Sequence, residues 1–332
     1  MPVSEFEIIA RYFDIQSVKR NDVVLGIGDD CALLDCNAAQ HPSDLLAVTM
    51  DTLVAGVHFP EATEAFDIGY KALAVNLSDL AAMGATPNWI TLALTLPEAS
   101  EPWLHEFSQG LFELASQYGV ALIGGDITRG PLTITIQAHG SVPKRHALRR
   151  SGAREGDLIV VSGTLGDAAL GLMFQQEHLP RFEANEDEIH FFTQRLNRPQ
   201  PRVRLGEHLR DIATAAIDIS DGLAADLQHI LKASDCGAVL DVNKLPFSTA
   251  ALSIADNVNL FEIAMSSGDD YELCFTIPES RAAELQILEA ACGCQLTVIG
   301  EINSKPGLQL RRGSNATLNN STQLEQSGYR HF

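Results

Sequence analysis

The segment that decides the fold is FDIGYKALAVNLSDLAAM, residues 66–83. It is long, rich in alanine and apolar on most of its faces, a pattern that predicts a buried helix. Near its end it carries Asn76, Ser78 and Asp79 among apolar neighbours. A carboxylate that is removed from water is costly unless it is paired. The segment therefore predicts a buried helix that carries an acid with a specific role.

Strands and further helices are predicted on both sides of this segment. In the N-terminal half we expect helices at 4–13 and 103–118, and strands at 23–27, 45–50, 89–96, 120–123 and 132–140. The strand at 120–123 is expected to be short and buried, and it ends in Gly124-Gly125-Asp126. The chain becomes basic and contains Gly and Ser over residues 143–154, where we place a domain boundary. The expected domains are residues 1–145 and 146–332.

The C-terminal half shows the same mixture of elements. We expect strands at 158–162, 215–219, 271–277 and 296–299, and helices at 166–176, 202–209, 223–233 and 281–290. The polar tail at 311–327 is expected to be a loop. Because strands and helices are mixed in both halves, the fold class is α/β or α+β, with two layers in each domain.

The charge of the chain excludes some classes of partner. The 332 residues include 43 acidic and 23 basic ones, which gives a formal net charge of −20. Nucleic-acid backbones and membrane surfaces are bound by basic patches, so we expect neither as a partner. The N-terminus lacks the pattern of a signal peptide, no run of apolar residues is long enough to span a membrane, and the six cysteines are scattered. These features predict a reduced, cytoplasmic protein.

The acids occur in unusual settings, beside glycine or within apolar runs at the ends of predicted elements. These settings are Gly28-Asp29-Asp30, Thr49-Met50-Asp51, Asn76-Leu-Ser78-Asp79, Gly125-Asp126, Asp218-Ile-Ser220-Asp221 and Gly268-Asp269-Asp270. Taken singly, each acid has an ordinary interpretation as a turn residue, a helix cap or a solvated side chain. Taken together, they predict one acidic centre that binds Mg²⁺ or Mn²⁺, because these ions prefer oxygen ligands. The common nucleotide-binding and zinc-binding motifs are absent from the sequence.

Several longer segments carry a resemblance to a known family. They are residues 26–33 (GIGDDCAL), 51–59 (DTLVAGVHF), 71–85 (KALAVNLSDLAAMGA), 124–130 (GGDITRG), 216–222 (AIDISDG), 270–273 (DYEL) and 328–332 (GYRHF). In order along nearly the whole chain, they resemble thiamine-monophosphate kinase, within the superfamily of aminoimidazole ribonucleotide synthetase. The resemblance implies two mixed domains of that type and a homodimer formed through the N-terminal sheet. It also implies direct in-line transfer of a phosphoryl group from ATP to thiamine monophosphate, with several Mg²⁺ ions.

The resemblance also implies roles for individual residues. The implied magnesium ligands are Asp30, Thr49, Met50 through its backbone carbonyl, Asp51, Asp79, Asp126, Asp218 and Asp221. Of these, the residues expected to carry catalysis are Asp51, Asp79, Asp126 and Asp218. The implied ATP contacts are Gly125, Asp126, Arg150 and Ser220, and the implied acceptor contacts are His58, Asp269 and Tyr329. Asp269 stands where the family usually has Glu, one methylene longer, so we expect its contact with the acceptor to be longer or bridged by water.

Two other functions fit the acidic pattern. One is a related ATP-dependent enzyme with a different phosphate acceptor, and the other is a metal-dependent binding protein without catalytic activity. The second would need neither Arg150 nor the glycine-rich segment 124–130. The sequence leaves open the number of metal ions in each site and any requirement for a monovalent ion.

Overall fold

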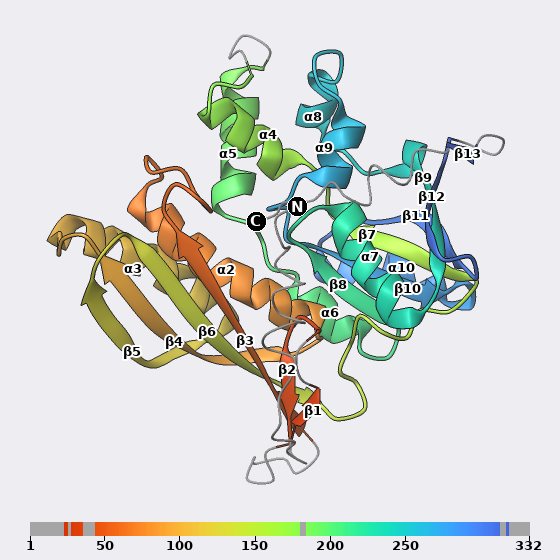
Figure 1. The fold of residues 1–332 in the computed structure, drawn as a ribbon, viewed down its shortest axis with the longest axis horizontal. Coiled ribbons are helices and arrows are strands. Elements are labelled where there is room, and N and C mark those ends of the chain that lie inside the picture. The colour runs from red at the N-terminus through yellow and green to blue at the C-terminus, as the bar shows by residue number, and fades with distance from the viewer. Residues whose placement is uncertain (1–22, 26–27, 36–43, 180–183, 313–316, 319–332) are drawn as a thin grey trace, which may run out of the picture.

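The computed structural model describes residues 23–25, 28–35, 44–179, 184–312 and 317–318 (Figure 1). These residues form two β-sheets that are joined by helices (Figure 1). The helix predicted at 4–13 lies outside the described residues. Within the described part of the chain, none of the helices combines the length and the apolar composition needed to cross a membrane.

The N-terminal sheet has six strands in the order β1-β2-β3-β6-β4-β5. Their bounds are β1 Val23–Leu25, β2 Ala32–Leu34, β3 Asp44–Val54, β4 Thr86–Leu96, β5 Ala121–Arg129 and β6 Thr133–Pro143. Neighbouring strands are antiparallel except β4 and β5, which are parallel. Helices α2 (Ala65–Ala82) and α3 (Glu101–Tyr118) pack against each other, and α2 contacts β3 and β6. Every second residue of β6 is therefore buried, whereas the opposite face of the sheet carries exposed side chains such as Met50 and Trp89.

The C-terminal sheet has seven strands in the order β13-β12-β9-β11-β7-β10-β8. The strands are β7 Asp157–Ser162, β8 Ala215–Ile219, β9 Gly237–Asp241, β10 Glu272–Pro278, β11 Leu296–Asn303, β12 Gly307–Arg311 and β13 Thr317–Leu318. The helices of this half are α4 Asp167–Gln175, α5 Glu186–Asn197, α6 Val203–Leu209, α7 Leu223–Ser234, α8 Thr249–Ser253, α9 Leu260–Ser266 and α10 Glu284–Cys292. Helix α7 covers one face of the sheet, and α2, α6 and α10 lie toward the other.

Helix α2 is shared by the two sheets. It contacts β3 and β6 of the N-terminal sheet and β8 and β10 of the C-terminal sheet, and nearly all of its residues are buried. The helix predicted at 66–83 is therefore confirmed, as is its burial. A helix that is apolar on most of its faces can be stable only where packed elements surround it, and the two sheets provide those surfaces.

Other expectations from the sequence need correction. Strand β5 is longer than the short buried strand expected at 120–123, and all nine of its residues are exposed. It forms the edge of the sheet, and among the helices that the structure describes none packs on it. Helix α5 and the shorter elements β9, α8, α9 and β12 were not expected, and β13 lies in a stretch expected to be a loop. The proposed boundary region, residues 143–154, connects β6 to β7.

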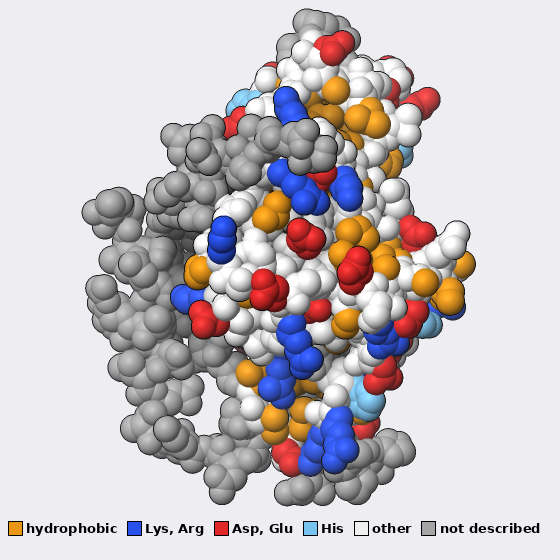
Figure 2. Space-filling view, turned by 90° about the vertical axis from the view of Figure 1, so that its right-hand side faces the viewer, with side chains coloured by type: hydrophobic (Ala, Val, Ile, Leu, Met, Phe, Trp, Pro, Cys, Tyr) orange, Lys and Arg blue, Asp and Glu red, His pale blue; other side chains and the backbone are white. Residues whose placement is uncertain are grey.

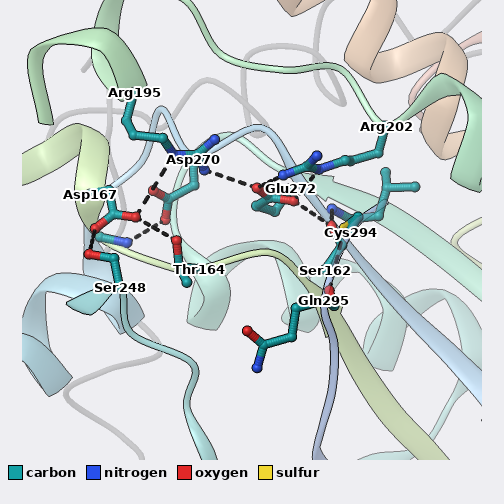
Figure 3. Close-up of polar contacts among 12 residues, drawn as sticks. Ser162, Thr164, Asp167, Arg195, Arg202, Ser248, Asp270, Glu272, Cys294 and Gln295 are labelled. Carbon is teal, nitrogen blue, oxygen red and sulfur yellow. Dashed lines mark hydrogen bonds and ion pairs between the residues drawn. The ribbon is translucent and has the colours of Figure 1, made fainter. Parts of the chain in front are cut away.

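A buried polar network fixes the end of β10 against α5 and β7 (Figure 3). The carboxylate of Glu272 accepts hydrogen bonds from Arg195 at 2.9 Å, from Arg202 Nε at 2.6 Å and from Ser162 Oγ at 2.5 Å. In the same region, Asp270 Oδ2 accepts a hydrogen bond from the backbone of Gly166 at 2.8 Å. Because these groups are buried, removing one partner would leave a charge uncompensated. The network therefore sets the position of the segment that precedes β10.

One face of the C-terminal domain carries both signs of charge. Figure 2 shows the face that this domain turns away from the N-terminal sheet, and there acidic and basic side chains are interspersed with small apolar patches. Several acidic side chains are instead buried in the interior, among them Asp30, Asp167, Asp218, Asp226 and Asp270. Part of the formal negative charge thus belongs to buried carboxyl groups, whose pKa values burial raises.

The backbones of α2 and α3 approach closely at two glycines. A Cβ atom on Gly110 would lie 1.9 Å from the carbonyl oxygen of Phe66, and one on Gly69 would lie 2.1 Å from that of Phe107. Both distances are below van der Waals contact, so any larger residue would push the two helices apart.

We expect Gly110→Ala to lower the free energy of unfolding by about 1–3 kcal/mol, because the added methyl overpacks the helix contact. In an unhindered helix the same change would raise it by up to about 1 kcal/mol. Urea denaturation would measure the difference, with Gln109→Ala, an exposed neighbour on α3, as the control. A Gly110→Ala protein as stable as the wild type would contradict the close approach of the helices.

Candidate active site

Three carboxylates meet where the two domains join. Asp30 lies just before β2, Asp79 lies on α2, and Asp218 lies on β8. One oxygen from each carboxylate lies within 4.8 Å of the corresponding oxygens of the other two. These three acids lie far apart in the sequence, and both sheets are needed to bring them together. We call Asp30, Asp79 and Asp218 the acidic cluster.

Burial makes the charged form of these acids costly. It raises the pKa of Asp218 to about 8, with neighbouring Asp30 as the next cause, and it raises the pKa of Asp79 well above its usual value, with Asp51 and Asp218 adding to the effect. The pKa of Asp51, which shares a hydrogen bond with Asp79, is raised to about 6, again mainly by burial. Such shifts mark carboxylates that lack sufficient positive charge nearby.

One cation forms an ion pair with the acidic cluster within the described part of the chain. Arg150 Nη2 lies 2.6 Å from Asp30 Oδ1, and the backbone N–H of Arg150 donates to Asp29 Oδ2 at 3.2 Å. The other oxygen of Asp30 is buried and has no hydrogen-bond partner. A single guanidinium cannot neutralise several clustered carboxylates, so the cluster carries uncompensated acidic groups that additional cations would satisfy.

The polar residues on α2 are explained by their partners around the cluster. Ser78 Oγ donates to Asp218 Oδ2 at 2.7 Å, and Thr49 Oγ1 donates to Asp79 Oδ2 at 2.5 Å. Asn76 Oδ1 accepts a hydrogen bond from the backbone of Asp51 at 3.2 Å. Helix α2 thus orients an acid of the C-terminal sheet and a strand of the N-terminal sheet at the same time. Ser78 and Asn76 were quoted in the sequence pattern, but it did not identify their partners.

The side chains of β3 divide between the two faces of the sheet. Thr49 and Asp51 point toward α2 and the cluster, whereas the Met50 side chain is 61% exposed on the opposite face. This follows from the alternation of side chains along a strand. Any role of Met50 as a ligand would therefore have to use its backbone, as the resemblance implies.

Asp126 and Gly125 lie elsewhere in the single chain. In the sheet, Asp126 is in register with Ala93, Thr135 and Thr52, so it lies on the open face, opposite to Asp51. Three strand spacings separate β5 from β3, about 14 Å. Gly125 is also required for packing, because a Cβ there would lie 1.9 Å from the carbonyl oxygen of Leu92. A single copy of the chain therefore does not bring Asp126 into the acidic cluster.

Ser220 and Asp221 follow β8 directly, and a residue that we did not predict fixes their loop. The backbone N–H groups of Asp221 and Gly222 donate to Asp226 Oδ2 at 3.0 and 3.1 Å. Asp226 is buried in the first turn of α7, and burial raises its pKa well above the usual range. The signal that could have identified it is an acid in the first turn of a helix that follows Gly222.

The residues expected to contact the acceptor are only partly described. His58 Nδ1 accepts a hydrogen bond from the backbone of Val54 at 3.0 Å and so fixes the turn after β3. Asp269 Oδ2 lies 3.0 Å from the Nζ atom of Lys71, which lies on α2. Tyr329 lies outside the described residues. Lys71 was not predicted, although a lone lysine in an otherwise apolar helix is an informative signal.

The ligand chemistry of the cluster fits hard divalent cations. Its donors are carboxylate oxygens, with the Thr49 and Ser78 hydroxyls beside them. Cys31 is the nearby sulfur, and burial together with the charge of Asp79 raises its pKa far above the usual value, which keeps the thiol protonated. Oxygen-rich sites without imidazole or thiolate favour Mg²⁺, Mn²⁺ or Ca²⁺ over zinc or copper.

Comparison with known proteins places both domains. The N-terminal domain of AIR synthase related proteins matches residues 28–142, and the C-terminal domain of the same proteins matches residues 154–313. Thiamine-monophosphate kinase of Salmonella typhimurium is 50% identical over 334 residues, which covers 100% of this chain and 99% of that protein. The Escherichia coli K12 enzyme of the same name is 49% identical, with the same coverage.

Two solved structures share the fold and much of the sequence. The crystal structure of thiamine-monophosphate kinase from Stenotrophomonas maltophilia is 48% identical, with a TM-score of 0.78 over 95% of this chain and 99% of that one. The structure of AaThiL complexed with AMPPCP and TMP is 30% identical, with a TM-score of 0.84 over 99% of this chain and 97% of that one. Since both domains and the full length match, this chain belongs to the thiamine-monophosphate kinase family of AIR synthase related proteins.

Proposed function

We propose that this protein transfers the γ-phosphoryl group of ATP to thiamine monophosphate, which yields ADP and thiamine diphosphate. The observation that carries this proposal is the buried acidic cluster, which joins the two domains in a chain of this family. AMPPCP is an analogue of ATP, and the related structure holds it together with TMP. A phosphate oxygen of the acceptor is already a nucleophile, so positioning and charge neutralisation can supply most of the catalysis.

We propose that the cluster holds Mg²⁺. The residues that would hold it are Asp30, Asp79 and Asp218, with Thr49 and Asp51 on β3, Asp221 after β8, and Met50 through its backbone. When bound, Mg²⁺ neutralises charge on the transferring phosphoryl group and screens the acids from the triphosphate. Ser78 and Arg150 already orient Asp218 and Asp30. Arg150 would turn part of its guanidinium toward the ATP phosphates, to which it can donate two hydrogen bonds.

A site of buried acids should make the metal-free protein sensitive to pH. The pKa of Asp218 rises from 3.8 to about 8, so between these values the folded protein binds more protons than the unfolded chain. Stability that the protonated form contributes is therefore lost as the pH rises through about 8. We expect the chelator-treated protein to melt at a lower temperature at pH 8.5 than at pH 6, and Mg²⁺ to raise the melting temperature at pH 8.5.

Asp218→Asn should reduce the difference in melting temperature between pH 6 and pH 8.5, because it removes one buried titratable group. It should also reduce the stabilisation by Mg²⁺, because it removes one metal ligand. The matched control is Asp256→Asn, which makes the same change in charge at an exposed position. Differential scanning fluorimetry at the two pH values, with and without Mg²⁺, would measure the shifts. Equal stabilisation of wild type and Asp218→Asn by Mg²⁺ would argue against a metal site at this cluster.

The acceptor should need a phosphate group. We expect ADP release with ATP and thiamine monophosphate, and none above background with unphosphorylated thiamine, because the thiamine hydroxyl would lie too far from the metal-bound γ-phosphate. In-line transfer requires the reacting atoms to be held about 3–3.5 Å apart. A coupled ADP assay against a panel of phosphate-bearing acceptors would test this and would also detect a related enzyme with another acceptor. Comparable turnover of thiamine would contradict the acceptor assignment.

We also propose that the protein is a homodimer in which the partner copy supplies Asp126 and Gly125. The support is geometric: Asp126 lies on the exposed edge strand β5 and on the open face of the N-terminal sheet. That face also exposes Met50 and Trp89, which are large apolar side chains suited to burial in an interface. A second copy packed on the open face would bring its β5 alongside β3 of the first, the strand that carries Asp51.

Two inactive variants should restore activity when they are mixed as heterodimers. In a heterodimer of Asp51→Asn and Asp126→Asn, one site would contain both mutations and the other neither, so random pairing should restore about a quarter of the wild-type sites. Co-expression with two different affinity tags, followed by measurement of ADP release, would test this. As the control, each variant is co-expressed with itself, one copy carrying each tag, so that every dimer contains the same mutation twice. If Asp126 served its own copy, every mixed site would carry one mutation and activity would stay absent.

A further inference from the structure

Lys71 is a buried cation that the proposed chemistry does not use. Its side chain is 3% exposed, and its Nζ atom lies 3.0 Å from Asp269 Oδ2. Among the described residues, no acceptor has hydrogen-bond geometry to this ammonium group. A buried ammonium is costly, so its position beside Asp269 indicates a specific role. The ion pair connects α2 to the segment that precedes β10.

That segment, residues 268–271, has a constrained backbone. Asp269 and Tyr271 have φ angles of +70° and +49°, in the left-handed region that non-glycine residues avoid. Two backbone hydrogen bonds join the segment to the end of β8: Asp269 N–H donates to Ser220 O and Tyr271 N–H donates to Ile219 O, both at 2.9 Å. Such conformations cost roughly 1–3 kcal/mol each and persist where surrounding contacts hold them, often at functional sites.

The segment lies beside the acidic cluster. The Tyr271 side chain is buried, forms a hydrogen bond with Asp269, and interacts electrostatically with Asp51 and Asp218. A chain of contacts therefore runs from Lys71 through Asp269 to Tyr271, whose hydroxyl lies within electrostatic range of Asp51 and Asp218. Arg150, the cation proposed for ATP, pairs with Asp30 instead. The two cations thus contact different acids of the site.

We propose that Lys71 is a positioning residue for the acceptor: by pairing with Asp269 it holds the segment 268–271 in the conformation that binds thiamine monophosphate. This inference rests on the proposed function and on the acceptor contact that the family resemblance implies for Asp269. Lys71 pairs with the Asp269 side chain, whereas the segment reaches Ser220, an implied ATP contact, through the backbone hydrogen bond from Asp269 N–H to Ser220 O, which does not use that side chain. Loss of Lys71 should therefore weaken binding of the acceptor more than binding of ATP.

The chain offers a matched control on the same helix. Arg198 pairs with Asp67 at 2.5 Å, and Asp67 lies one helical turn before Lys71 on α2. This pair also connects α2 to the C-terminal domain, but neither residue contacts the segment 268–271. A purely structural role for Lys71 would make Lys71→Met and Arg198→Met behave alike.

We expect Lys71→Met to raise the KM for thiamine monophosphate about tenfold or more and to change the KM for ATP less than about twofold. Arg198→Met should lower the melting temperature without changing the ratio of the two KM values. In the background of Asp269→Asn, Lys71→Met should add less than about twofold to the KM for the acceptor, because the two residues act as a unit. Lys71→Arg keeps the charge, so its KM for thiamine monophosphate should lie between those of the wild type and Lys71→Met.

The inference would be overturned if Lys71→Met raised the KM for ATP as much as the KM for thiamine monophosphate. It would also be overturned if the double variant raised the KM for the acceptor by the product of the two single effects. Amide hydrogen exchange gives a readout that does not depend on the acceptor: Lys71→Met should speed exchange at Asp269 and Tyr271, and Arg198→Met should not. Unchanged exchange at both amides would also overturn it. If the wild type fails to use thiamine monophosphate, the proposed function fails, and hydrogen exchange still decides whether Lys71 holds the segment.

Discussion

The structure depends on the burial of α2 between two sheets. The helix contributes apolar side chains to both cores, and the same burial forces each of its polar groups to find a partner. Those partners lie in both domains: Asn76 bonds to β3, Ser78 bonds to Asp218 on β8, and Lys71 pairs with Asp269. The contacts that pack the two domains together are therefore the contacts that assemble the candidate site. A change that moved α2 relative to either sheet would separate the acids of the cluster.

The cluster illustrates how a fold can favour binding of a cation. Desolvation and mutual repulsion oppose the charged forms of Asp79 and Asp218, and Arg150 compensates for only part of that charge. The raised pKa values mean that these acids hold protons more readily than free carboxyls do, and the hydrogen bonds that Ser78 and Thr49 donate to them offset only part of that shift. Divalent cations would replace those protons and satisfy the oxygens more fully. Neutral pH then lies close to the range in which protons and metal compete for the same oxygens.

The N-terminal sheet shows a second constraint, which arises from its topology. One face is covered by α2, and the other is open and carries Met50 and Trp89. Because side chains alternate along each strand, Asp51 and Asp126 lie on opposite faces although both come from the same sheet. An exposed edge strand such as β5 invites pairing or burial by another chain unless it is protected. The exposure of β5 at the edge of the sheet and the alternation of its side chains thus both support the proposal that Asp126 serves a second copy.

Sequence alone predicted the buried helix, most of the long strands and the residue types of an acidic, oxygen-rich centre. These features are local: apolar periodicity predicts burial, and acidic residues within apolar runs indicate carboxylates that need a cation as their partner. The sequence did not predict helices α5 and α8, nor the exposure of β5, because packing against distant segments decides them. It named Asp30, Asp79 and Asp218, but only the fold shows that their oxygens meet and that Asp126 lies apart from them. The partners Lys71 and Asp226 also emerged only from the structure, because a contact between residues far apart in the chain leaves no local pattern in either segment.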